Sequence, residues 1–255
     1  MGITSQYDYG ILHLTIDNPR KRNAIDASMF TTLTEQLVNA EADDKVRVVL
    51  LRGGEQIFSA GADMQESLEH PEAQDEAMIN FFDALRTFPK PIVAEVSGPA
   101  VGEAFTILLY CDLVYAAKRA LFSMPNVALA RAPRFGATRI FAQSAGAPQA
   151  AEKLLLSEPI TADEALQMRL ITAVYDDEDL PKVTAAKVAR LAVLPPQAVR
   201  LTKARLVQVR NNPILHEIDE EESAYQRQLD SAEAGEALKA FLEGRKPVFK
   251  PDTLQ

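Results

Sequence analysis

The chain has 255 residues, of which 47% are hydrophobic and 25% charged, so it can form one large domain, or one domain plus a small helical appendage, without disulfide support. Its net charge of -9 argues against nucleic-acid binding, because phosphate contacts need a basic face. The single cysteine, Cys111, excludes an intramolecular disulfide and favours a reducing compartment. With no leader-like N-terminus and no long apolar run, we expect a cytoplasmic protein that does not enter a membrane.

The first half of the chain alternates between predicted strands and predicted helices. Alternating apolar residues predict a half-buried strand at 11–16, and Asp26 is suited to cap a helix that continues to Ala42. Later apolar patterns predict strands at 46–51, 92–96 and 113–117, and helices at 72–88 and 102–111. This alternation is typical of a sheet with crossover helices rather than of a meander.

From Pro148 onward the pattern is mostly helical. Helical periodicity predicts helices at 148–156, 162–169, 180–193, 196–210, 213–230 and 232–243. The prolines at 195 and 196 separate two of them. We therefore divide the chain into a first region, 1–195, and a helical region, 196–255. The amphipathic helices of the second region are expected to pack on the first region or on another subunit.

Two glycine-containing turns are the strongest local candidates for a site. The sequence contains no dinucleotide-binding, Walker, HExxH, CxxC or GxSxG motif, its three histidines are scattered, and no metal site is expected. Residues 59–63 follow one predicted strand, and residues 98–102 lie between another strand and a helix. Backbone amides before a helix favour negative charge, so two such turns could hold one oxyanion. On spacing alone, ordinary turns remain the better explanation.

Seven segments in this order carry a resemblance to a known family. They are NPRKRNAID, FSAGADM, KPIVAEVSGPAVG, CDLVYAA, ALFSMPNVALA, EALQMRLITAVY and AEAGEALKAFLEGRKPVF. Over almost its whole length the chain resembles the crotonase superfamily, also called the enoyl-CoA hydratase/isomerase family. The resemblance implies an α/β fold, a spiral of repeated β-β-α units with a C-terminal helical trimerisation region. It also implies an acyl-CoA substrate and a homotrimer or dimer of trimers.

The resemblance further implies the parts of an acyl-CoA site. The amides of Ala62 and Glu103 would form the oxyanion hole, and Tyr225 would cover the adenine of a neighbouring subunit. The CoA phosphates would lie near Arg20, Lys21 and Arg22. The adenine would lie against Ala60, Asp63, Met64 and Gln65. Coenzyme A would enter only as part of the substrate, so no separate cofactor is expected.

The chain departs from the family at each side chain that would handle protons. Where hydratases of the family have two glutamates, the alignment places Thr106 and Asn126, and where isomerases have one, it places Arg134. None of these can act as a carboxylate base at neutral pH. Glu103 is the one new carboxylate in the right place, whereas Glu95 fits the polar side of a half-buried strand.

Three functions remain open on the sequence. The first is an enoyl-CoA hydratase or isomerase-like enzyme with a non-standard acid or base. The second is a malonyl-type acyl-CoA decarboxylase, in which Arg131 and Arg134 would receive the substrate carboxylate, although both arginines are expected to be exposed. The third is a catalytically inactive acyl-CoA-binding paralogue.

Overall fold

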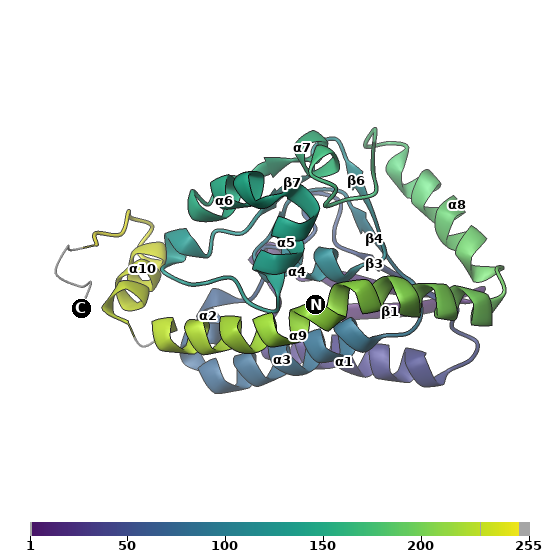
Figure 1. Ribbon diagram of the computed structural model, residues 1–255, viewed down its shortest axis with the longest axis horizontal. Helices are drawn as coiled ribbons and strands as arrows, with labels where there is room; N and C mark the ends of the chain where they lie inside the picture. Colours follow the sequence, from purple (N-terminus) through teal and green to yellow (C-terminus); the bar gives the residue numbers. More distant parts are fainter. Residues whose placement is uncertain (1, 230, 250–255) are drawn as a thin grey trace.

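A six-stranded sheet forms the centre of the fold (Figure 1). The computed structural model describes residues 2–229 and 231–249, with side chains for all of these except 209–217. The strand order is β1-β2-β3-β4-β6-β9, in which β1 runs antiparallel to β2 and the remaining neighbours run parallel. The strands are β1 (Gly2–Asp8), β2 (Ile11–Asp17), β3 (Val48–Arg52), β4 (Ile92–Val96), β6 (Leu113–Ala117) and β9 (Ala173–Tyr175).

A smaller sheet and ten helices complete the described part of the chain. The small sheet has the order β5-β7-β8, from β5 (Ala100–Val101), β7 (Leu121–Ser123) and β8 (Ile160–Thr161). The helices are α1 (Ala27–Ala42), α2 (Met64–Glu69), α3 (Pro71–Thr87), α4 (Glu103–Tyr110), α5 (Ala137–Ala145), α6 (Ala147–Leu155), α7 (Ala162–Gln167), α8 (Leu180–Ala192), α9 (Pro196–Leu229) and α10 (Ala232–Leu242). Two short 3-10 helices, η1 (Pro19–Lys21) and η2 (Val127–Leu129), lie in loops.

The large sheet is buried on both faces. Strand β4 has no exposed residue, as expected for a central parallel strand covered by helices on both sides. The main core lies between one face and helices such as α1, α3 and α4. A second, smaller apolar cluster joins β3, β4 and β6 to Leu180 and Val188 of α8, which covers the other face (Figure 1).

Most of the long predicted elements are confirmed, and so is the α/β class. Asp26 caps α1, where its carboxylate accepts a hydrogen bond from the Met29 amide at 2.9 Å. Strand β1, helix α5 and the strands of the small sheet were not predicted, because short or exposed segments carry little periodicity. The prediction of separate helices at 196–210 and 213–230 is wrong, since α9 continues through Pro213. A proline removes only one amide donor, and the hydrogen bonds on either side can continue the helix.

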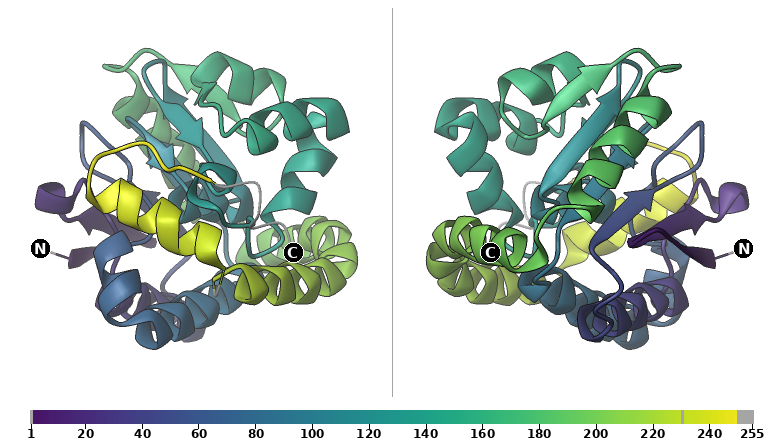
Figure 2. Two further views of the ribbon diagram at one scale, coloured as in Figure 1. Left: turned by 90° about the vertical axis from the view of Figure 1, so that its left-hand side faces the viewer. Right: turned by 90° about the vertical axis from the view of Figure 1, so that its right-hand side faces the viewer.

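The C-terminal helices pack on the first region of the same chain. Helix α9 crosses the width of the molecule, and α10 lies at its far end against η2 (Figures 1 and 2). Near the start of α9, the ammonium of Lys203 donates to the Lys90 carbonyl and to the Asp112 carboxylate, both at 2.7 Å. Packing within the chain is therefore seen, while the boundary at residue 195 and the trimeric assembly stay predictions. Among the described residues, no helix has both the length and the apolar character needed to span a bilayer.

Candidate functional site

The first of the two glycine turns follows β3 and is held tightly by backbone and side-chain hydrogen bonds. The Ser59 hydroxyl donates to the Asn23 carbonyl at 2.7 Å and accepts from the Gly61 amide at 3.0 Å. Gly61 has a φ of 90°, and a Cβ there would lie 2.6 Å from the Val101 carbonyl oxygen. Only glycine therefore allows this turn to approach the second turn so closely.

The second turn leads into α4 and lies directly against the first. The Phe58 amide donates to the Pro99 carbonyl at 3.0 Å, and the Val101 amide donates to the Ser59 carbonyl at 3.0 Å. Gly102, with a φ of 58°, precedes Glu103, the first residue of α4. The Glu103 amide stands at the positive end of this helix and has no partner within it.

The two turns lie against each other, and the amide of Ala62 in the first is bonded to a carboxylate oxygen of Glu103 from the second. The Ala62 amide donates to Oε2 of Glu103 at 3.2 Å. The Glu103 amide lies 3.4 Å from where a Cβ on Gly61 would be, so both amides border the same space. The Glu103 oxygen stands in for the oxygen of an anionic ligand at this point. The arrangement can therefore hold a negatively charged oxygen.

The two positions that align with hydratase glutamates serve the backbone of their own segments. Thr106 is buried one turn along α4, and its hydroxyl lies 3.4 Å from the Gly102 carbonyl. The Asn126 side-chain amide donates to the Ala132 carbonyl at 3.4 Å, and the backbone carbonyl of Asn126 accepts from the Arg131 amide at 2.8 Å. Neither group titrates near neutral pH.

Arg134 is buried, so the expectation that it is exposed is wrong. Only 3% of the residue is exposed, and its guanidinium pairs with Asp75 of α3 and, at 2.7 and 2.8 Å, with Glu222 of α9. Burial alone would lower the pKa of Arg134, but its bonds to Asp75 and Glu222 outweigh this and raise it. Two carboxylates compensate the buried charge. Because both lie far from Arg134 in the sequence, no local pattern predicts this pairing.

Tyr225 of α9 packs over Arg134 in the same chain. The guanidinium carbon lies 4.0 Å from the centre of the Tyr225 ring, and the residue is 6% exposed. Burial raises the pKa of the Tyr225 phenol, with smaller opposing effects from Arg131 and Arg134 and a further increase from Glu103. The phenol is thus within electrostatic range of the Glu103 carboxylate. Its suggested contact with the adenine of a neighbouring subunit stays a prediction.

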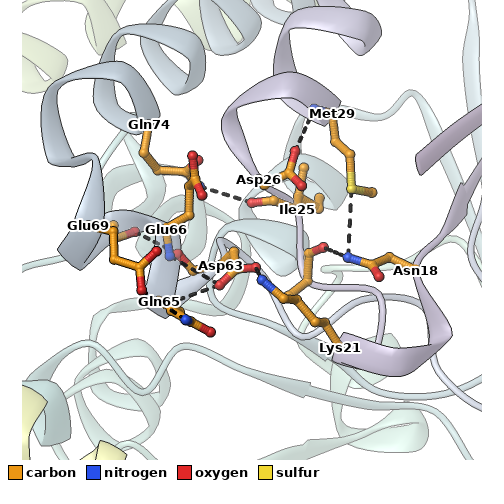
Figure 3. Close-up of polar contacts among 12 residues, drawn as sticks. Asn18, Lys21, Ile25, Asp26, Met29, Asp63, Gln65, Glu66, Glu69 and Gln74 are labelled. Carbon is orange, nitrogen blue, oxygen red and sulfur yellow. Dashed lines mark hydrogen bonds and ion pairs between the residues drawn. The ribbon is translucent and has the colours of Figure 1, made fainter. Parts of the chain in front are cut away.

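The basic segment lies beside the first turn. The Ala60 amide donates to the Arg22 carbonyl at 3.1 Å, and the Ile25 amide donates to the Gly61 carbonyl at 2.8 Å. Lys21 forms a 2.6 Å ion pair with Asp63, which caps α2 by accepting from the Gln65 and Glu66 amides (Figure 3). Within the described residues, Arg20 and Arg22 form no ion pair, and both are exposed.

The remaining residues suggested for adenine lie on the same stretch. Met64 and Gln65 begin α2, and the side-chain amide of Gln65 donates to the Glu69 carboxylate at 2.9 Å (Figure 3). Met64 Sδ lies 3.9 Å from a guanidinium nitrogen of Arg131. The structure thus gathers the suggested phosphate and adenine contacts beside the first turn, and Arg131, which lines one cavity with Tyr225, reaches Met64 of the same stretch.

Three polar residues near these elements are buried, and of these the sequence analysis considered only Glu95. Glu95 is 6% exposed and lies 3.9 Å from Arg52, so its placement on a half-buried strand is wrong, because α8 covers that face. Lys90 is buried, and its ammonium donates to the Ala40 and Asp43 carbonyls that end α1. Gln74 of α3 is also buried. The only sequence feature that could have indicated their burial is a polar residue inside or next to an apolar helical or strand pattern.

Comparison with known proteins identifies the family and agrees with the fold. The family model for enoyl-CoA hydratase/isomerase matches residues 6–252, and the chain belongs to this family. The crystal structure of an enoyl-CoA hydratase/isomerase from Pseudoalteromonas atlantica T6c superposes with a TM-score of 0.92 at 30% identity, covering 98% of this chain and 100% of that one. The predicted crotonase-type fold is therefore confirmed.

Curated relatives with similar sequence identity to this chain are named for different activities. The 1,2-epoxyphenylacetyl-CoA isomerase of Escherichia coli is 33% identical over 97% of both chains. Enoyl-CoA delta isomerase 2 of Rattus norvegicus is 33% identical over 87% of this chain but only 58% of its own length. The chain thus spans less than two thirds of that relative. The family is shown, and the particular reaction is a separate question.

Proposed function

We propose that this protein binds an acyl-CoA thioester, stabilises its enolate with the Ala62 and Glu103 amides, and shifts a double bond between enoyl-CoA isomers. The observation that carries the proposal is the carboxylate oxygen of Glu103, which the Ala62 amide holds at 3.2 Å. A site that binds a carboxylate oxygen in the free protein has the donors that a thioester oxyanion needs. Because these donors are backbone amides, side-chain substitution does not remove them.

A bound substrate would exchange places with the Glu103 side chain. The thioester oxygen takes over the Ala62 amide, and the carboxylate moves aside. It then lies near the α-carbon, because that carbon is bonded directly to the thioester carbonyl carbon. A carboxylate within hydrogen-bond reach of a carbon acid can act as general base.

The proposed reaction needs only this one carboxylate. Glu103 removes a proton from the α-carbon of a 3-enoyl-CoA, and the negative charge of the dienolate rests on the thioester oxygen in the hole. The protonated Glu103 then returns the proton to the γ-carbon, which leaves the double bond between the α- and β-carbons. No atom is gained or lost, and the carboxylate is regenerated.

Hydration is the less favoured reaction because it needs a second group to activate water. Thr106 and Asn126, which align with the hydratase glutamates, are a hydroxyl and an amide that bond to backbone carbonyls. Decarboxylation is also less favoured, because two carboxylates of the chain already occupy Arg134. Arg131 alone remains to receive a substrate carboxylate.

The CoA part of the substrate would follow the basic segment. We place its phosphates near Arg20 and Arg22, with Lys21 tied to Asp63, and its adenine against the start of α2. Coenzyme A belongs to the substrate in this proposal and no separate cofactor takes part. A homotrimer or dimer of trimers remains the expected assembly, which light scattering would measure.

The test is the conversion of a 3-enoyl-CoA to its conjugated 2-enoyl isomer by the wild type and by E103Q. We expect E103Q to lower kcat by about 10²- to 10⁴-fold, the usual contribution of a general base. Its acyl-CoA affinity should not fall, because a neutral amide competes less for the Ala62 amide than a carboxylate does. T106A serves as the control and should change kcat by only a few fold. No conversion by the wild type, or full activity in E103Q, would sink the proposal.

A further inference from the structure

A small cavity lies between α2, α3 and α9 and has a mixed polar lining. Its volume is about 140 Å³, and Ser67, Gln74, Met78, Arg131, Tyr225 and Leu229 are among the residues that line it. This is well below the roughly 300–1,000 Å³ of pockets for drug-sized ligands. The cavity suits a short chain of a few carbon atoms rather than a long fatty acyl tail.

Backbone and side-chain bonds connect the cavity to the oxyanion-hole turn. The Gln74 side-chain amide donates to the Ile25 carbonyl at 2.9 Å, and the same carbonyl accepts from the Asp63 amide at 2.9 Å (Figure 3). Ile25 and Ala62 also form an isolated parallel β-bridge. On the other side, Arg131 reaches Met64, the residue after Asp63. An acyl chain whose thioester oxygen lies at Ala62 therefore has this cavity as a neighbour.

Gln74 presents an unused acceptor in this region. The residue is 1% exposed, and its side-chain oxygen has no hydrogen-bond partner among the described residues, although its nitrogen is bonded to the Ile25 carbonyl. A buried acceptor without a partner costs about 1–3 kcal/mol, so such atoms generally meet a ligand or water. A purely apolar acyl chain would leave it unsatisfied.

Arg131 supplies the uncompensated positive charge. Within the described residues no ion pair joins Arg131 to a carboxylate, whereas the neighbouring Arg134 has two. The carboxylates at the cavity do not neutralise Arg131: Asp75 is held by Arg134 and Gln226, and Glu72 is exposed. The Tyr225 phenol, also at the cavity, can donate a hydrogen bond to an anion.

We propose that this cavity binds the distal end of a short acyl group that carries a carboxylate, so that the preferred substrates are dicarboxylic acyl-CoA thioesters. Arg131 and Tyr225 bind the carboxylate, and the Gln74 oxygen accepts from a water or hydroxyl beside it. This inference rests on the proposed acyl-CoA function and names its substrate class. An acyl chain ending in a methyl group would desolvate Arg131 and Gln74 without replacing their hydrogen bonds.

The test compares two CoA thioesters of equal carbon number by calorimetry. Glutaryl-CoA ends in a carboxylate and valeryl-CoA ends in a methyl group. We expect the wild type to bind glutaryl-CoA at least about tenfold more tightly than valeryl-CoA. This affinity ratio corresponds to about 1.4 kcal/mol from charge-assisted hydrogen bonds. In R131Q this ratio should fall to about one, and in Y225F, which keeps the ring over Arg134, it should fall partly.

A matched control distinguishes the effect of the charge at the cavity from the effect of the protein's net charge. R190Q removes one positive charge from the exposed outer side of α8 and should keep the wild-type ratio. Equal affinity of the wild type for the two thioesters, or an unchanged ratio in R131Q, would overturn the inference and leave the acyl-CoA function intact. If neither thioester binds more tightly than CoA alone, both the inference and the proposed function fail.

Discussion

Asp63 shows how one residue beside the site supports two neighbouring structures. Its carboxylate caps α2 through the Gln65 and Glu66 amides and also pairs with Lys21. The residue is 4% exposed, whereas the Lys21 side chain is 47% exposed. The cap should therefore contribute more to stability than the ion pair, because solvent screens an exposed partner.

Two substitutions of Asp63 separate these contributions. We expect D63A to lower the free energy of unfolding by about 1–2 kcal/mol, because it removes the cap and the ion pair. D63N should lower it by less than about 1 kcal/mol, because asparagine caps helices as well as aspartate does. Urea unfolding at neutral pH measures both. Equal losses in the two variants would show that the ion pair, not the cap, dominates.

The same residue predicts a pH dependence. Burial would raise the pKa of Asp63, but its bonds to Lys21 and to the α2 amides outweigh this and lower the pKa below its ordinary value. A lowered carboxyl pKa stabilises the fold above the unfolded-state pKa of about 4, and this contribution is lost as the pH falls through the folded-state value. The stability difference between wild type and D63N should thus shrink as the pH falls below about 4. A difference that grew on acidification would contradict this assignment.

At the residue scale, the sequence predicts the backbone part of the site better than the side-chain part. The turns alone indicate only a possible oxyanion site, and it is the resemblance to the family that points to the amides of Ala62 and Glu103. The direction of the Glu103 side chain, which returns to the Ala62 amide, depends on tertiary packing. The partners of Arg134 come from α3 and α9, far away in the sequence, and no local pattern indicates them.

At the element scale, α9 holds the loop before α5. The Glu221 carboxylate accepts from the Gly136 amide at 2.6 Å and the Thr138 amide at 3.1 Å, and thereby caps the start of α5. Its neighbour Glu222 pairs with Arg134 of the same loop. Two adjacent glutamates of α9 thus fix the loop that also carries Arg131.

Removal of Arg134 should loosen this connection. We expect R134M to lower the free energy of unfolding by about 3 kcal/mol, the lower end for breaking a buried ion pair, because Asp75 and Glu222 can reach water. Amide hydrogen exchange should rise at residues 218–229 and in the first turn of α5. R134K, which keeps the charge without the bidentate pair, should lower the free energy of unfolding by less than R134M does. Unchanged exchange in R134M would mean that α9 is held by other contacts.

Element prediction succeeds where burial produces a clear period. Helix α3 has this signal, and strand β4 is found instead by its continuous apolar run, whereas β7 and β8, at three and two residues, are too short for either. Lys90, two residues before β4, shows a further limit. A lysine there suggests an exposed strand start, yet its ammonium satisfies the terminal carbonyls of α1. Only the packing of α1 beside this strand gives the lysine that role.

At the scale of the whole molecule, the site is assembled from segments that are distant in sequence. The turn after β3 and the turn before α4 carry the two amides, the segment before α1 carries the basic residues, and α9 lines the cavity proposed for the acyl end. Helix α9 therefore contributes to the proposed site within one chain. Figure 2 shows α9 beside α3 along the lower edge of the molecule, with α10 above them.

The most direct test of the oxyanion hole is the infrared spectrum of a bound acyl-CoA with a ¹³C-labelled thioester carbonyl. The Ala62 and Glu103 amides should polarise this carbonyl more strongly than water, so its stretching frequency should fall on binding. A62P, which removes one donor, should lessen the shift, provided that circular dichroism shows an intact fold. A labelled carbonyl that binds with the same frequency as in water would contradict the assignment of the oxyanion hole to these two amides.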